Sequence, residues 1–290
     1  MTSFPGTPIT PAVARTACAG PTGVPTVALR LRAIGPGADL PPVGMMLSRL
    51  DDVERARAAR ARDTAASGSF AAGRYLLRLL VADLLGEGSE RLVSDSTCPR
   101  CGPAGRPDHG RPSYLLDGER VPLALSLSRA GGFALLGALD LRGVAPTGPA
   151  APGVAPARPP ALRIDPAGPR ARGGDPAGPP RPGVAPLGAP ALGIDLAAAS
   201  EVDFDGFDGV ALTSEEQRAV GLLPFADRGR ARARLWTRKE ALVKALGTGF
   251  TAGDPDAVDV LRDARITDLQ AVEGTVLEPL GLVAAVAVAG

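Results

Sequence analysis

A proline-rich segment near the middle of the chain constrains the fold most, because it separates two parts that must fold around it. From Gly143 to Leu192 the 50 residues contain 14 prolines, 9 glycines and 12 alanines. Neither a helix nor a sheet interior accommodates so much proline and glycine, and the segment has few large apolar side chains for a core. We therefore expect residues 143–190 to be a disordered insert between two folded parts.

The insert also repeats itself. GVAP begins at positions 143, 153 and 183, DPAGP begins at 165 and 175, and PALRID (160–165) resembles PALGID (190–195). These copies indicate that a short connection expanded by local duplication. The alternative is a functional proline-rich ligand for a partner domain, but the segment has no regularly spaced PxxP array.

The composition of the whole chain indicates a globular protein and argues against several function classes. Of 290 residues, 45% are hydrophobic and 22% charged, and the net charge of +1 provides no overall field for nucleic acid or a membrane surface. No apolar run is long enough to cross a membrane, and three cysteines favour a reducing compartment over a disulfide framework. We expect a cytoplasmic monomer that binds neither nucleic acid nor membrane, with residues 1–25 a disordered tail rather than a signal peptide.

In the first half, the residue patterns predict a strand, a helical region and a pair of strands. TVALRLRA (26–33) alternates like a strand, and residues 50–86 are predicted to be helical with an apolar face. Two β-like runs follow at 123–128 and 133–139, separated by a Gly-Gly pair.

The second half has a similar order of elements. LGIDL (192–196) predicts a buried strand, and LTSEEQ predicts a helix start with Thr213 or Ser214 as its N-cap. In the next helix we place Thr237 in the first turn and Gly247 at the end. The final strand, GLVAAVAVAG, resembles GFALLGALD in the first half, which indicates a duplicated architecture.

Both lysines of the chain, which has 30 arginines, lie in LWTRKEALVKALGTGF (235–250). Trp236, Glu240 and Lys244 are spaced four residues apart, so they lie along one face of a helix. One interpretation is a surface helix with a single Glu–Lys pair. The other is a carboxylate and an ammonium directed at a bound phosphate and its metal, and the grouping of the lysines favours it.

A second acid, Asp195, ends the GID strand 45 residues before Glu240. Two such carboxylates can hold Mg²⁺, which takes one or two protein carboxylates and completes its octahedron with waters and phosphate oxygens. A nearby lysine then acts as a point charge on the phosphate.

These segments resemble the 4′-phosphopantetheinyl transferase family, in its larger, surfactin-synthetase type. GIDL, LTSEEQ and WTRKEALVKALGTGF carry the resemblance in the second half, and AAGRYLLRLL, HGRP and LSLSRAGG carry it in the first. It covers about residues 26–142 and 191–290, and the spacing of GID and WxxKExxxK is its most specific part. The resemblance implies an α/β (α+β) fold of two pseudo-symmetric subdomains, each a small sheet packed by helices, with the active site in the cleft between them.

The resemblance also implies an activity: Mg²⁺-dependent transfer of the 4′-phosphopantetheine arm of coenzyme A to a serine of an acyl or peptidyl carrier protein. The carrier would belong to a fatty acid, polyketide or peptide synthase. By position, Asp195 and Glu240 would bind Mg²⁺, and Lys244 would contact the pyrophosphate. Glu240 would also help to deprotonate the serine, directly or through a metal-bound water. Lys239 has no such role and is expected only to cover the helix surface.

The coenzyme A site that the resemblance implies is lined by residues of the first half, namely Arg74, Arg111, Ser128 and Arg129. The 3′-phosphate would lie near Arg111 and Arg129, and Arg55 is a further candidate from a region that does not align securely.

The sequence departs from the family pattern at two positions. The family's G-I-D-x-E has Ala197 in place of its glutamate, so one metal ligand is missing, and a water, Glu201 or Glu216 could replace it. The histidine of the family's S-H-S segment is Arg129 here, which can still bind phosphate. The first hypothesis is therefore an active transferase, and the alternative is a non-catalytic or weakly active relative that binds coenzyme A or a carrier domain.

A separate motif, CPRCGPAGRPDHG, places Cys98 and Cys101 at C-x-x-C spacing, with His109 eight residues further on. A structural zinc site needs four ligands, and the segment offers two cysteines and one histidine, with Asp108 as the only nearby candidate for the fourth. A surface turn with two thiols is the alternative that we favour.

Overall fold

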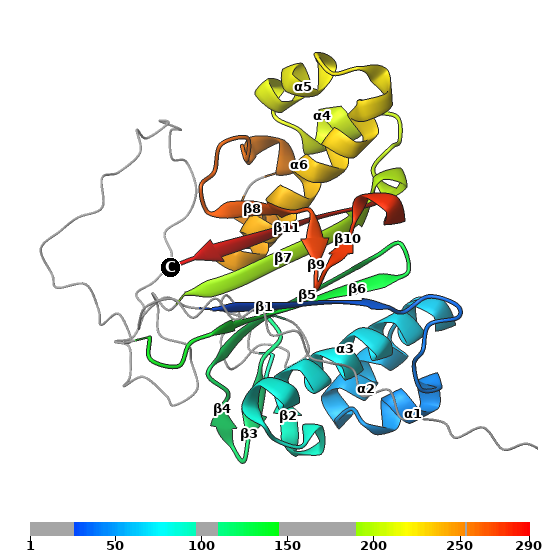
Figure 1. Ribbon diagram of the computed structural model, residues 1–290, viewed down its shortest axis with the longest axis vertical. Coiled ribbons are helices and arrows are strands. Elements are labelled where there is room, and N and C mark those ends of the chain that lie inside the picture. Colours follow the sequence, from blue (N-terminus) through cyan, green and yellow to red (C-terminus); the bar gives the residue numbers. More distant parts are fainter. Residues whose placement is uncertain (1–25, 97–109, 145–189, 253) are drawn as a thin grey trace, which may run out of the picture.

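The computed structural model of the protein describes residues 26–96, 110–144, 190–252 and 254–290 (Figure 1). The expected tail, most of the proline-rich insert and the C-x-x-C segment with its histidine lie outside the described residues. The described chain combines helices with small antiparallel sheets, which confirms the α+β class. None of the helices in those ranges is long and apolar enough to span a lipid bilayer.

The N-terminal half contains helices and strands in the following order: β1 (Val27–Ala33), α1 (Val43–Ser48), α2 (Asp52–Ala59), α3 (Thr64–Leu85), β2 (Leu92–Ser94), β3 (Tyr114–Leu116), β4 (Glu119–Arg120), β5 (Leu123–Ala130) and β6 (Phe133–Asp140). One antiparallel sheet has the order β1-β6-β5 and a second has the order β2-β3-β4. The predicted strand pair is confirmed as the β5–β6 hairpin, in which Gly131 and Gly132 turn with φ of 55° and 77°.

The C-terminal half contains the following elements: β7 (Ala191–Ala198), α4 (Phe207–Ala211), α5 (Ser214–Gly221), α6 (Phe225–Leu246), β8 (Ile266–Leu269), β9 (Ala271–Val272), β10 (Thr275–Val276) and β11 (Leu282–Ala289). The main sheet has the order β7-β11-β8, and β9 pairs with β10. Each half therefore has a three-stranded sheet whose central strand is the last of that half. A symmetry relation between the halves stays a prediction.

Three apolar clusters hold these layers together. Leucines of α3 pack on β5 and β6 in the N-terminal half, and α6 packs on β8 and β11 in the C-terminal half (Figure 1). The third cluster joins the halves, because Leu135 and Leu139 of β6 pack with Leu192 and Ile194 of β7. Burial of these side chains holds the two main sheets next to each other, with β5 beside β7.

The ends of the C-terminal helices test the predicted boundaries. Thr213 is the N-cap of α5, and it forms a capping box with Glu216. Gly247 ends α6 in the left-handed region, with φ of 69°, as expected. The placement of Thr237 in a first turn is wrong, because α6 begins at Phe225 and Thr237 lies buried halfway along it. The arginine- and alanine-rich segment before Thr237 continues the helix, and its one glycine does not interrupt it.

Candidate active site

The glycine of the GID segment allows α6 to lie directly on β7. A Cβ atom on Gly193 would lie 1.9 Å from the carbonyl oxygen of Ala241 and 2.5 Å from the nitrogen of Ala245, so no larger residue fits. The next residue of β7 whose side chain points to the same face is Asp195. The close approach of helix and strand therefore brings Asp195 to the face of α6 that carries Glu240 and Lys244.

Asp195 is buried and accepts hydrogen bonds from both halves of the chain. Its Oδ1 accepts from Ser128 Oγ of β5 at 2.7 Å and from Lys244 Nζ of α6 at 2.5 Å. Lys244 Nζ also donates to the carbonyl oxygen of Ile194 at 3.3 Å. Burial raises the pKa of Asp195 above its ordinary value, although Lys244 and Ser128 act in the opposite direction. The structure thus joins three of the residues predicted from the sequence.

Asp195, Glu240 and Lys244 line a cavity of about 820 Å³ that we call the acidic cavity. Its other lining residues include Ser128, Arg129, Ala197, Glu201, Phe204, Phe207, Val210, Trp236, Asp254 and Asp256. Burial raises the pKa of Glu240, and the charge of Asp195 raises it further against the effect of Lys244. Trp236, Glu240 and Lys244 thus share one face of α6, as their spacing predicts.

The acidic cavity fits a divalent cation with two carboxylate ligands. Asp195 and Glu240 repel each other, and a cation between them would relieve the repulsion that raises the pKa of Glu240. Ala197 lines the same cavity and contributes no ligand. Within the described residues there is no group of three or more His, Cys, Asp or Glu side chains that could hold a metal.

The two acids considered as replacement ligands differ. Glu201 lines the acidic cavity, but its carboxylate accepts hydrogen bonds from the backbone nitrogens of Gly131 at 3.2 Å and Ala198 at 3.3 Å. Glu216 does not line the cavity, because it is fully buried in an ion pair with Lys239. The hypothesis that Glu216 could replace the missing metal ligand is therefore wrong.

A second cavity, of about 500 Å³, carries the opposite charge. We call it the arginine cavity, because four of its lining residues are Arg57, Arg74, Arg111 and Arg129. It shares Arg129, Glu240 and Lys244 with the acidic cavity, so the two meet at these residues.

Three of the four arginines surround one aromatic ring. The guanidinium carbons of Arg57, Arg74 and Arg129 lie 5.4, 5.6 and 5.6 Å from the centre of the Phe70 ring. Burial lowers the pKa of Arg129, and the positive charges of Arg74 and Arg57 lower it further. Such a cluster of like charges is stabilised by a bound anion.

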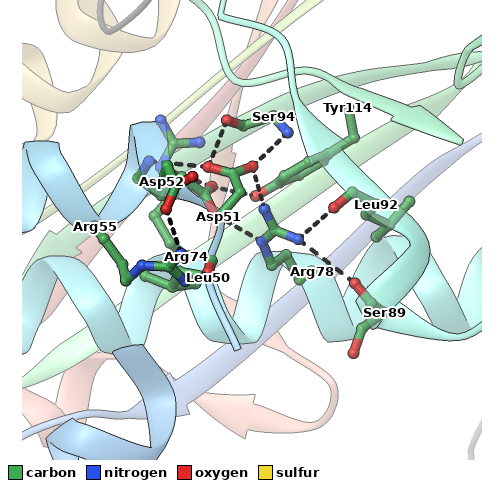
Figure 2. Close-up of polar contacts among 11 residues, drawn as sticks. Leu50, Asp51, Asp52, Arg55, Arg74, Arg78, Ser89, Leu92, Ser94 and Tyr114 are labelled. Carbon is green, nitrogen blue, oxygen red and sulfur yellow. Dashed lines mark hydrogen bonds and ion pairs between the residues drawn. The ribbon is translucent and has the colours of Figure 1, made fainter. Parts of the chain in front are cut away.

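A polar network positions Arg74 at this cavity. One turn further along α3, Arg78 is buried and donates to Glu54 Oε2 at 2.6 Å, to Asp51 Oδ2 at 2.5 Å and to the carbonyl oxygen of Leu92 at 2.6 Å (Figure 2). Arg78 therefore fixes α3 against α2 and β2. Arg74 is also buried, with its Nε 3.8 Å from Glu54 Oε1, but its Nη1 has no hydrogen-bond partner within the described part of the chain. A buried donor without a partner favours a ligand at this place.

Arg111 lines the arginine cavity from the segment before β3, but its guanidinium is engaged. Nε donates to the carbonyl oxygen of Lys244 at 3.1 Å and Nη2 to that of Ala245 at 2.6 Å. These are carbonyls of the last turn of α6, where a positive charge is favourable. Arg111 therefore joins the two halves of the chain at the wall of the arginine cavity.

One arginine suggested by the sequence lies outside the arginine cavity, and two of the side chains that line this cavity were not predicted. Arg55 lines neither cavity, because it pairs with Asp52 at 2.5 Å on the exposed side of α2. Arg57 was missed, since ERARAARARD gives no way to choose among its arginines. Phe70 was also missed, although its place four residues before Arg74 puts both on one face of α3.

Lys239 is not a surface residue, so that expectation is wrong. Its side chain is fully buried, with Nζ 2.6 Å from Glu216 Oε2. Nζ also donates to the carbonyl oxygens of Pro255 at 2.7 Å and Val258 at 2.6 Å. Lys239 therefore fixes the segment that forms one wall of the acidic cavity.

Comparison with known proteins bears on the C-terminal half. Residues 191–277 match a family model described as the 4′-phosphopantetheinyl transferase superfamily. The match includes Asp195, Glu240 and Lys244. Among curated proteins, no relative matches the chain.

Proposed function

We propose that the chain transfers the 4′-phosphopantetheine arm of coenzyme A to a serine of an acyl or peptidyl carrier protein, because residues 191–277 match the family model of the 4′-phosphopantetheinyl transferase superfamily. The observation that carries this proposal is the meeting of two cavities of opposite charge at Glu240 and Lys244. A phosphate-rich donor in the arginine cavity and an acceptor hydroxyl in the acidic cavity can therefore both reach Glu240 and Lys244.

The arginine cavity supports binding of coenzyme A. Its arginines suit the 3′-phosphate and the pyrophosphate, because a guanidinium can donate two parallel hydrogen bonds to one phosphate. Arg74 Nη1, which has no hydrogen-bond partner among the described residues, provides a donor for a phosphate oxygen. Lys244, one third exposed, provides a compact charge for the pyrophosphate at the junction of the cavities.

Asp195 and Glu240 would hold the divalent cation. When bound, Mg²⁺ neutralises charge on the pyrophosphate oxygens and so favours departure of the leaving group. On this view Ser128 and Lys244 orient the Asp195 carboxylate through their hydrogen bonds to Oδ1. Ser128 therefore acts on the acidic cavity and not as a lining residue of the arginine cavity.

Glu240 is suited to accept the proton of the acceptor serine. The serine oxygen forms a bond to the β-phosphorus of coenzyme A, and the bond from that phosphorus to the bridging oxygen breaks, so 3′,5′-ADP leaves with the electron pair. Glu240 lines both cavities, so its carboxylate can accept the serine proton while the donor is bound in the arginine cavity.

The test is labelling of carrier proteins by the full chain. One apo-carrier each from a fatty acid, a polyketide and a peptide synthase is incubated with fluorescent coenzyme A, with Mg²⁺ or with a chelator. We expect Mg²⁺-dependent labelling of at least one carrier, which a serine-to-alanine carrier abolishes. Binding of coenzyme A without labelling of any carrier would instead favour the weakly active or non-catalytic relative, for which Ala197 is the motivating observation.

We expect Arg129→Ala to raise the KM for coenzyme A by about 10- to 100-fold with little change in kcat. One lost hydrogen bond to a charged group accounts for about 1.5–3 kcal/mol, and a contact with the 3′-phosphate, which is not a reacting group, stabilises ground and transition states alike. The measurement is steady-state kinetics with coenzyme A and with dephospho-coenzyme A, which lacks the 3′-phosphate. Arg111→Ala should also raise the KM for coenzyme A more than it lowers kcat, although it breaks the contacts with α6 as well.

With the dephospho analogue the Arg129→Ala penalty should largely disappear. Arg55→Ala is the matched control, because Arg55 lines neither cavity, and it should behave like the unmodified protein. An undiminished penalty with the analogue would refute the contact between Arg129 and the 3′-phosphate.

We expect Ala197→Glu to lower the Mg²⁺ concentration for half-maximal rate. Ala197 lines the acidic cavity two residues after Asp195, so a glutamate there adds a third carboxylate on the same face. Ala197→Gln matches its size without its charge and should shift the midpoint much less. If both variants keep the original midpoint, the two-carboxylate metal site is wrong.

A further inference from the structure

The rim of the acidic cavity exposes apolar side chains on α4 and on the segment that leads to it. Phe204 and Val210 line the cavity and are 57% and 61% exposed. Phe204 packs edge-on against Phe207 with ring centres 5.4 Å apart, and Phe207 packs edge-on against Trp236 at 6.0 Å. This row of rings runs from the surface to α6, one turn before Glu240. Phe204 and Val210 are thus an exposed apolar pair at the mouth of the cavity, and the buried ring of Phe207 supports Phe204 from below, as is typical of a contact surface.

Carboxylates stand around these apolar side chains. Asp254 and Asp256 are exposed and line the cavity, and within the described residues neither has an ion pair or side-chain hydrogen bond. Glu201 lies on the same rim. Arg232 does not offset them, because it pairs with Asp208 at 2.7 Å and with Asp203 at 3.4 Å. The rim is therefore apolar at its centre and negative at its edge.

This charge distribution assigns the two cavities to different substrates. A polyanion is attracted by the arginine cavity and repelled by unpaired carboxylates. The acceptor serine must still reach Glu240, which lines both cavities. An acceptor that enters through the acidic cavity reaches Glu240 without crossing the phosphates of the donor.

Building on the proposed transfer reaction, we propose that the acceptor protein docks on the rim formed by Glu201, Phe204, Val210, Asp254 and Asp256. The acceptor places an apolar side chain on Phe204 and Val210 and basic side chains opposite the carboxylates. Its preferred carrier domain is thus one whose serine is flanked by apolar and basic residues rather than by acidic ones.

Two variants of the full chain test this docking surface, Phe204→Ala and the double variant Asp254→Lys/Asp256→Lys. The acceptors are one carrier domain with lysines beside its serine and the same domain with glutamates there. For the lysine carrier, Phe204→Ala should raise the KM about 10-fold, and the double variant should reverse the preference to the glutamate carrier. The Kd of coenzyme A, measured by calorimetry, should stay within about twofold for Phe204→Ala.

The matched controls are Phe225→Ala and Glu119→Lys. Phe225 is 87% exposed, and Glu119 is exposed on the β3–β4 hairpin, and neither lines either cavity. Both should leave the KM for the lysine carrier unchanged, and thermal melting should show that all variants fold.

The outcomes separate the docking surface from the reaction. If the unmodified chain labels the carriers and all variants have the same carrier KM, the docking surface is refuted, but the proposed transfer reaction is not. If the unmodified chain labels neither carrier, the proposed transfer reaction is refuted. The docking surface is then tested by measuring the binding of fluorescent apo-carrier to the unmodified chain and to Phe204→Ala. Weaker binding of the lysine carrier to Phe204→Ala would support it, and equal or absent binding would refute it.

Discussion

Replacing Lys239 with methionine should lower the free energy of unfolding by about 3–5 kcal/mol. The substitution keeps the apolar stem but removes a charge that is fully buried with Glu216. The Glu216 carboxylate would then stay buried without its cation, and the carbonyl oxygens of Pro255 and Val258 would lose a donor. Urea unfolding of the purified full chain measures the change.

The partner substitution distinguishes the ion pair from the loss of packing. Lys239→Met combined with Glu216→Gln leaves no uncompensated charge, so the double variant should be more stable than Lys239→Met alone. Arg230→Met, on an exposed part of α6, should cost less than about 1 kcal/mol. A similarly small cost for Lys239→Met would contradict the structural role assigned to this lysine.

Local patterns in the sequence were sufficient for most of the secondary structure. Alternation predicted β1, and two β-like runs around a Gly-Gly pair predicted the β5–β6 hairpin. The N-cap signal predicted a helix start at Thr213 or Ser214, and the glycine stop predicted Gly247. These features depend on neighbours within a few residues, which a sequence displays directly. The same holds for Glu240 and Lys244, whose four-residue spacing puts them on one face.

The features that sequence reasoning missed depend on packing between distant segments. Lys239 resembled a surface residue because its partner Glu216 lies on α5, and the carbonyl groups that it contacts lie after α6. The beginning of α6 was placed too late, because its first turns are arginine-rich and carry little apolar periodicity. Arg57 was not distinguished from Arg55, since only the position of Phe70 across the α2–α3 pair separates them.

Glu240→Gln should reduce kcat by about two to four orders of magnitude, the usual contribution of a general base. The glutamine keeps the size of the side chain but cannot accept the serine proton, and it is also a weaker ligand for a cation. The assay is carrier labelling at saturating coenzyme A and Mg²⁺. Glu215→Gln, an identical change on the exposed face of α5, should retain full activity.

Stability provides a readout that is independent of activity. Burial and the charge of Asp195 raise the pKa of Glu240 in the folded protein above its value in the unfolded chain. Such a carboxyl contributes stability below the unfolded pKa, and this contribution is lost as pH rises through the folded pKa. At neutral pH the ionised Glu240 therefore destabilises the fold, so Glu240→Gln should keep or raise the melting temperature. A lower melting temperature of Glu240→Gln would instead indicate that the variant loses activity because its fold is destabilised.

The pH dependence identifies the base itself. The rate of the unmodified chain should fall as pH decreases through the pKa of Glu240, because a protonated Glu240 can neither accept the serine proton nor hold the cation. The residual rate of Glu240→Gln should not show this acid limb, because the titrating group is gone. The measurement is kcat/KM for the carrier from acid to neutral pH, within the range where melting curves show both proteins folded. An acid limb that persists in Glu240→Gln would assign that limb to another carboxyl such as Asp195, whose pKa burial also raises. A variant that keeps most of its activity would show that another group accepts the proton.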